Sequence, residues 1–181
     1  ETFDVSNDAW IGLSWFAYPN SAEVDGISCS MFIVQRAIDR VQQVIELYCE
    51  PNGHFPHNPE PLPENLGEIS KQVKEQGADL GFVVDPDVDR LCMVCENGEM
   101  FGEEYTLVSI ADYILKHTPG NTVSNLSSTR ALRDVTEKNG GQYFASAVGE
   151  VNVVTLMKEQ NAIIGGEGNG GVIYPASHYG R

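Results

Sequence analysis

Three aspartates alternate in the short run Asp85-Pro-Asp87-Val-Asp89-Arg90. The apolar residues of 77–84 indicate a buried strand directly before them, so the carboxylates come at the strand's carboxyl end, where open α/β sheets bind ligands. Three negative charges in one turn repel one another strongly unless a hard divalent cation neutralises them. We therefore predict a catalytic magnesium site with Asp85, Asp87 and Asp89 as ligands.

The acidic loop has two other interpretations. Together with Glu96, the three aspartates match positions 1, 3, 5 and 12 of a calcium-binding EF-hand loop. That loop requires a glycine at position 6 and helices on both sides, whereas this chain has Arg90 at that position and strand-like flanks. The remaining alternative is a solvated acidic turn without a metal. The magnesium site is preferred over both.

Glycines dominate a second segment, Gly165-Gly-Glu-Gly-Asn-Gly-Gly171, which also satisfies the pattern G-x-G-x-x-G. A dinucleotide-binding loop with that pattern must open a helix, but residues 172–174 have an extended pattern and Pro175 follows them. A dinucleotide site is therefore not expected. From the residues alone, a glycine-rich hairpin turn remains an alternative to a binding loop.

The pair Cys92-x-x-Cys95 raises the question of a zinc or redox site. It lies in the apolar run 91–95, which reads as a strand, and residues three apart on a strand face opposite sides. The sequence therefore favours cysteines of a core over a pair that binds metal.

Strands and helices are predicted to alternate along most of the chain. Residues 1–23 show no clear period, and five prolines in 50–64 predict an irregular loop. The alternation predicts an α/β fold of two domains, with a boundary near residue 102. The expected strands span 44–49, 77–84, 91–95, 121–126 and 161–164, with one more that ends at 24–26 and another near Tyr143. The expected helices span 32–41, 66–76, 105–116, 129–138 and 151–159.

Charge and composition narrow the range of partners. The chain carries 26 acidic and 11 basic residues, a formal net charge of −15, which disfavours nucleic acid and anionic membranes as partners. No segment has the apolar length of a membrane span, and the first residues lack the pattern of a signal peptide. We expect a soluble, cytoplasmic protein, and the sequence leaves its oligomeric state open.

The acidic loop resembles the metal loop of the α-D-phosphohexomutases, which is usually written D-G-D-G-D-R. In that family the three aspartates hold Mg²⁺ beside a phosphoserine, and the arginine helps to bind phosphate. The resemblance therefore implies Mg²⁺ as the cofactor and a catalytic, phosphate-binding role for Arg90. Pro86 and Val88 stand at the family's glycines.

The glycine loop is similar to the family's sugar-binding signature, G-E-x-S-G-H, whose glutamate and serine hydrogen-bond two adjacent sugar hydroxyls. The resemblance implies that Glu167 and Asn169 contact a hexose phosphate, with Gly168 between them in the same loop. Asn169 replaces the serine and Gly171 the histidine, so the sugar could be glucosamine, mannose or glucose, and the loop with the run 49–63 slightly favours glucosamine.

The resemblance implies two consecutive phosphohexomutase domains of the α/β/α type with mixed sheets. The second family domain is expected at 22–101 with the metal loop, and the third at 102–181 with the sugar loop, shortened at its end. Residues 1–21 are unassigned and are interpreted as a first-domain remnant or an altered leader.

The family interconverts hexose 1-phosphate and 6-phosphate through a phosphoserine and a bisphosphate intermediate, as an intramolecular phosphotransferase. The serine loop T-A-S-H-N-P is not found, and Ser177 in Ala176-Ser177-His178 lacks its Asn-Pro. We therefore expect a fragment that is inactive alone. The alternative is a non-catalytic, metal-dependent module that binds sugar phosphates.

Overall fold

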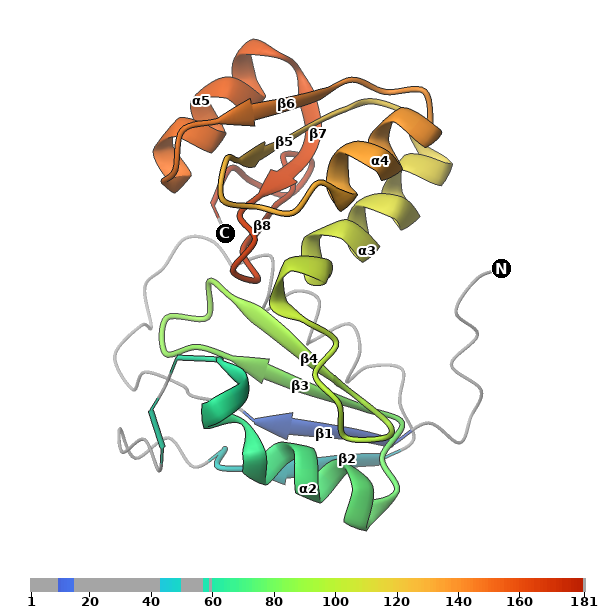
Figure 1. Ribbon diagram of the computed structural model, residues 1–181, viewed down its shortest axis with the longest axis vertical. Coiled ribbons are helices and arrows are strands. Elements are labelled where there is room, and N and C mark those ends of the chain that lie inside the picture. The colour runs from blue at the N-terminus through green and yellow to red at the C-terminus, as the bar shows by residue number, and fades with distance from the viewer. Residues whose placement is uncertain (1–9, 15–42, 50–56, 59, 181) are drawn as a thin grey trace. The chain divides into compact units, whose positions relative to one another are not determined.

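A computed structural model describes residues 10–14, 43–49, 57–58 and 60–180 of the chain. The chain divides into two compact units, 1–101 and 102–181, each with its own sheet (Figure 1). Among the described residues, no helix has both the length and the apolar character needed to cross a bilayer.

The first unit is built on a four-stranded mixed sheet in the order β2-β1-β3-β4. Its strands are β1 (Trp10–Ser14), β2 (Gln43–Leu47), β3 (Leu80–Val84) and β4 (Leu91–Cys95). β1 is parallel to both β2 and β3, whereas β4 runs antiparallel to β3. The antiparallel pair means that a short loop suffices to join β3 to β4, and the acidic loop is that connection.

Helix α2 (Gly67–Gln76) covers one face of this sheet, after a short 3-10 turn, η1 (Pro63–Asn65). Ile69 and Val73, four residues apart on the helix, are buried against Val83 and Val94 of the strands. Gly81 permits this close approach, because a Cβ there would lie 3.0 Å from Val73 and 3.1 Å from Val94. The helix thereby fixes β3, which carries the acidic loop.

The second unit repeats the same arrangement of strands, in the order β6-β5-β7-β8. Its strands are β5 (Asn121–Asn125), β6 (Tyr143–Ser146), β7 (Ala162–Gly166) and β8 (Val172–Ile173). β5 is parallel to β6 and β7, and β8 is antiparallel to β7. The glycine loop therefore joins the third and fourth strands of its sheet, as the acidic loop does in the first unit.

Helices lie on both faces of the second sheet: α3 (Glu103–His117) and α4 (Ala131–Lys138) on one side, and α5 (Glu150–Glu159) on the other (Figure 1). Alternate residues of β5 face the two layers. Val123 packs with Val153 and Met157 of α5, whereas the Thr122 hydroxyl shares a 2.7 Å hydrogen bond with the Thr136 hydroxyl of α4. The two buried hydroxyls thereby satisfy each other's hydrogen-bonding groups.

The predicted α/β fold with mixed sheets and flanking helices is confirmed, and most predicted elements agree with the structure to within a few residues. No element is predicted in residues 1–23, yet β1 is a central strand there, paired with β2 and β3. Its pairing depends on strands far along the chain rather than on a local pattern. The predicted strand ending at 24–26 and the helix over 32–41 lie outside the described residues.

The two cysteines of β4 face opposite sides of the sheet, as the sequence predicts. Cys92 is buried beside Val83, and its thiol donates to the Pro61 carbonyl over 3.4 Å. Cys95 pairs in register with Leu80, which belongs to the cluster on the opposite face. The strand geometry therefore separates the two sulfurs.

Candidate functional site

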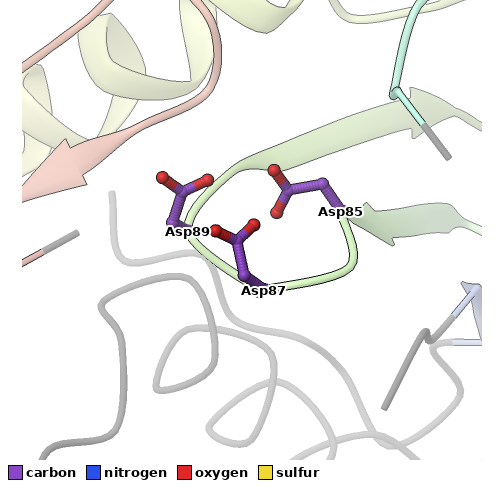
Figure 2. A group of neighbouring side chains, drawn as sticks. All are labelled: Asp85, Asp87 and Asp89. Carbon is purple, nitrogen blue, oxygen red and sulfur yellow. The ribbon is translucent and has the colours of Figure 1, made fainter. Parts of the chain in front are cut away.

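The acidic loop begins where β3 ends, and its three carboxylates converge (Figure 2). One carboxylate oxygen from each of Asp85, Asp87 and Asp89 lies within 4.8 Å of the others. Asp85 is buried, with 3% of its surface exposed, whereas Asp87 is open to solvent. A cluster of oxygen ligands with one solvent-facing side suits a hard divalent cation that keeps some of its water ligands.

The backbone of this loop turns sharply at Val88. The Val88 N–H donates to the Asp85 carbonyl over 3.1 Å, and Val88 has a φ of 60°. This left-handed conformation is unfavourable for a β-branched residue and favourable for glycine. The turn between Asp87 and Asp89 therefore includes a strained backbone conformation at Val88.

Arg90 ends the loop and pairs with the carboxylates around it. Its Nε lies 3.2 Å from Asp85 Oδ2 and 3.6 Å from Asp89 Oδ1, and its Nη1 lies 3.5 Å from Glu60 Oε1. Its backbone N–H also donates to Asp85 Oδ1 over 3.1 Å. The guanidinium thus places a positive charge beside this group of acids.

The environment of Asp85 disfavours its ionised form. Burial is the largest cause, followed by a hydrogen bond with Asp89 and the negative charge of that neighbour, and together they raise the pKa of Asp85 to about 7. The backbone N–H of Arg90 opposes this shift. A divalent cation at this loop would relieve the repulsion, so the residues present fit a bound magnesium ion.

The glycine loop of the second unit is closed by its own backbone. The Glu167 N–H donates to the Gly171 carbonyl over 3.0 Å, and the Gly171 N–H donates to Asn169 Oδ1 over 3.2 Å. Gly168 packs closely against the loop that follows β5, since a Cβ on Gly168 would be 3.1 Å from the Ser128 Cα. Glu167, Gly168 and Asn169 are therefore held together in one compact turn.

Glu167 is a buried carboxylate, with 6% of its surface exposed, and it is anchored by two other loops. Asn125 Nδ2, at the end of β5, donates to Glu167 Oε1 over 2.7 Å. The Gly149 N–H, at the start of α5, donates to the same oxygen over 3.2 Å. Carboxyl ends of neighbouring parallel strands supply these contacts, which is the usual location of ligand sites in such sheets.

Sequence reasoning did not single out Asn125 or the serines that follow it. Ser127 and Ser128 donate to Asn125 Oδ1 over 3.1 Å and 2.6 Å. The signal in the sequence was a polar run, Asn125-Leu-Ser-Ser128, directly after a buried strand. Because β5 neighbours β7 in the sheet, the residues at the carboxyl end of β5 are candidates for a ligand site beside the glycine loop.

Both parts of the chain match models of one protein family. The model described as phosphoglucomutase/phosphomannomutase α/β/α domain II matches residues 27–98, and that of domain III matches residues 102–181. A phosphoglucomutase/phosphomannomutase of Thermococcus kodakarensis is 38% identical over 141 residues, which are 77% of this chain and 31% of the relative. A phosphomannomutase/phosphoglucomutase of Pseudomonas putida is 33% identical over 141 residues, covering 76% of this chain and 30% of that protein.

Solved structures agree with these matches. The crystal structure of a phosphoglucomutase/phosphomannomutase family protein from Burkholderia thailandensis superposes with a TM-score of 0.74 at 26% identity, covering 98% of this chain and 38% of that one. The chain thus spans about a third of the length of these relatives. The predicted pair of α/β/α domains is confirmed, and the chain belongs to the phosphoglucomutase/phosphomannomutase, or phosphohexomutase, family.

Proposed function

We propose that this chain supplies the metal-binding and sugar-binding loops of a phosphohexomutase, which interconverts hexose 1-phosphate and hexose 6-phosphate. The observation that carries the proposal is the convergence of three aspartate carboxylates within 4.8 Å directly after a buried strand. Relatives are named phosphoglucomutase/phosphomannomutase and probable phosphoglucosamine mutase, which supports a hexose phosphate as the substrate class. The donor would be a phosphoserine, with a bisphosphorylated sugar as the intermediate.

Asp85, Asp87 and Asp89 would hold Mg²⁺ in this proposal. When bound, Mg²⁺ supplies positive charge that neutralises the oxygens of a phosphoryl group in transfer. Asp87 is the exposed one of the three, whereas buried Asp85 fixes the site to β3.

Arg90 would contact the phosphate in this proposal. Its guanidinium has parallel N–H donors that match phosphate oxygens. In the structure it pairs with Asp85 and Asp89 at 3.2 Å and 3.6 Å, which keeps it beside the proposed metal ligands. Neutralising these carboxylates would weaken their hold on the guanidinium and let it pair with an anion.

Glu167 and Asn169 would bind the sugar hydroxyls. A carboxylate accepts hydrogen bonds from hydroxyls, and a buried carboxylate held in a fixed direction accepts them with high selectivity for orientation. Gly168 would let the backbone approach the sugar ring without a side chain between them. Glu167 and Asn169 would only form hydrogen bonds and would not react, so the same loop would hold the sugar in either orientation.

Titration calorimetry with Mg²⁺ tests the proposal. We expect the wild-type chain to bind Mg²⁺ and Asp87→Asn to bind it at least about tenfold more weakly, since a charged ligand is lost. Asp134→Asn is the matched control, because Asp134 is an exposed helix residue outside the site. Adding glucose 1,6-bisphosphate should strengthen metal binding in the wild type. A folded wild-type chain that binds no Mg²⁺ would contradict the proposal.

A further inference from the structure

We propose that Asn125 is a positioning residue that fixes the carboxylate of Glu167 in the orientation that reads sugar hydroxyls. The inference rests on the proposed function, because it assigns to Asn125 a role in the site where Glu167 binds the sugar. Neither the metal-loop nor the sugar-loop motif contains Asn125, which lies 42 residues before Glu167 in the sequence.

The contact itself is short, buried and between adjacent strands. Asn125 is 3% exposed and Glu167 is 6% exposed, and their side chains are joined over 2.7 Å. Asn125 ends β5 and Glu167 directly follows β7; these strands are parallel neighbours, so both residues stand at the same edge of the sheet. A hydrogen bond to a carboxylate in such an environment is stronger than one between neutral groups.

The direction of the Asn125 amide is set by two hydroxyls. Ser127 and Ser128 both donate to Oδ1, which turns the Nδ2 group toward Glu167. A flipped amide would place its oxygen against the carboxylate oxygen and lose this attraction. The run Asn125-Leu-Ser-Ser128 thus works as a unit that presents one N–H donor to Glu167.

The second donor to Glu167 comes from a different direction. The Gly149 N–H and Asn125 Nδ2 both approach Oε1, one from the start of α5 and the other from the end of β5. Two donors on one oxygen determine the plane of the carboxylate. The plane of a carboxylate determines where its lone pairs point, and hence which arrangement of hydroxyls it accepts.

Asn125→Asp is the sharpest test, since it keeps the shape of the side chain and replaces the donor with a carboxyl group. Above the pKa of that group, two like charges face each other and the Glu167 carboxylate is pushed out of place. At lower pH, one shared proton restores a hydrogen bond between the pair. A positioning role therefore predicts a new pH dependence, which a merely structural role would not produce.

Calorimetry measures the affinity of each full-chain variant for glucose 1,6-bisphosphate in the presence of Mg²⁺. The affinity of each variant is divided by the wild-type affinity at the same pH, so that effects of pH on the metal loop cancel. For Asn125→Asp we expect affinity at about pH 8 to fall at least tenfold and at about pH 5.5 to recover to within about threefold. Asn97→Asp, in an exposed turn of the first unit, is the control for the added charge and should match the wild type at both pH values.

Ser128→Ala gives a second, milder variant should Asn125→Asp fail to fold. Loss of one orienting hydroxyl should weaken binding about threefold, without a new pH dependence. Loss of binding in Glu167→Gln with full binding in both Asn125→Asp and Ser128→Ala would overturn the inference and leave the proposed function standing. Binding unaffected by Glu167→Gln, or absent in the wild type, would overturn the proposed function and the inference with it.

Discussion

Arg90 and Asp85 close the acidic loop by contacting each other twice. The Arg90 backbone N–H donates to Asp85 Oδ1 over 3.1 Å, and the Arg90 Nε lies 3.2 Å from Asp85 Oδ2. Both carboxylate oxygens of Asp85 are therefore engaged by one residue. The loop holds its ligand geometry through a positive charge of its own, and this charge must compete with any cation that binds the same oxygens.

Arg90→Gln is expected to tighten Mg²⁺ binding in the absence of phosphate, by about threefold to tenfold, and to lower the thermal stability of the metal-free chain. Removal of the guanidinium leaves Asp85 and Asp89 with no neutralising charge from this residue, so the site becomes more negative. Calorimetry gives the affinity, and melting followed by circular dichroism gives the stability.

Arg133→Gln is the matched control for that prediction. Arg133 forms exposed ion pairs with Asp134 and Glu137 on α4, and pairs of this kind contribute little. It should change neither Mg²⁺ affinity nor melting temperature appreciably. Weaker Mg²⁺ binding by Arg90→Gln would mean that the arginine shapes the metal site rather than competing with the metal.

Asp85 makes the stability of the metal-free chain depend on pH. Its pKa is about 7 in the folded chain, whereas the ordinary value is 3.8. Between these two pH values the folded chain keeps a proton on Asp85 that the unfolded chain has released. The stability contributed by this proton is present at about pH 4 and is lost as the pH rises through about 7. Saturating Mg²⁺ favours ionised Asp85, so in its presence this loss of stability with rising pH should disappear.

Melting temperatures at about pH 6 and about pH 8, with and without Mg²⁺, check this prediction. The stabilisation by Mg²⁺ should be larger at the higher pH. Asp85→Asn should make the metal-free chain more stable than wild type at the higher pH, because the repulsion with Asp89 is removed, and should abolish the response to Mg²⁺. An equal Mg²⁺ effect at both pH values would show that Asp85 does not release a proton on metal binding.

Local patterns in the sequence were sufficient to predict the acidic loop. Its ligands lie within five residues of one another, and the apolar run before them identifies a buried strand. The loop directly follows β3 in the chain and therefore lies at the carboxyl end of that strand. The spacing of the aspartates and the strand before them are local features, so the sequence alone was enough to predict a cluster of carboxylates here.

Contacts between distant segments were not predictable in the same way. The strand β1 is defined by its pairing with β2 and β3, and nothing in its five residues alternates as a half-buried strand would. Asn125 was likewise missed, since its significance comes from a hydrogen bond to a residue that directly follows a neighbouring strand. Arg90 was predicted to bind phosphate, and its contacts with Asp85, Asp89 and Glu60 emerged only from the geometry.

Gly166→Ala should disrupt the glycine loop. A Cβ at this position would collide with the Gly171 carbonyl, which accepts the hydrogen bond that closes the loop. We expect a loss of stability of about 1–3 kcal/mol and a loss of glucose 1,6-bisphosphate binding. Gly67→Ala is the control, since a Cβ there meets nothing within 4 Å. Retention of both properties by Gly166→Ala would show that the loop can rearrange without its glycine.

Val88 offers a test of the strain in the acidic loop, because it has a φ of 60° at a position where the family signature has glycine. Val88→Gly and Val88→Ala both lose the packing of this partly buried side chain, but only glycine adopts the left-handed conformation without penalty. The glycine variant should therefore be more stable than the alanine variant by about 1 kcal/mol, the reverse of the usual order of these residues. Urea unfolding of the two variants measures this difference, and Mg²⁺ titration should show binding by the glycine variant at least as tight as that of the wild type. An alanine variant as stable as the glycine variant would mean that the loop relaxes out of the left-handed conformation, and that the aspartate spacing does not depend on it.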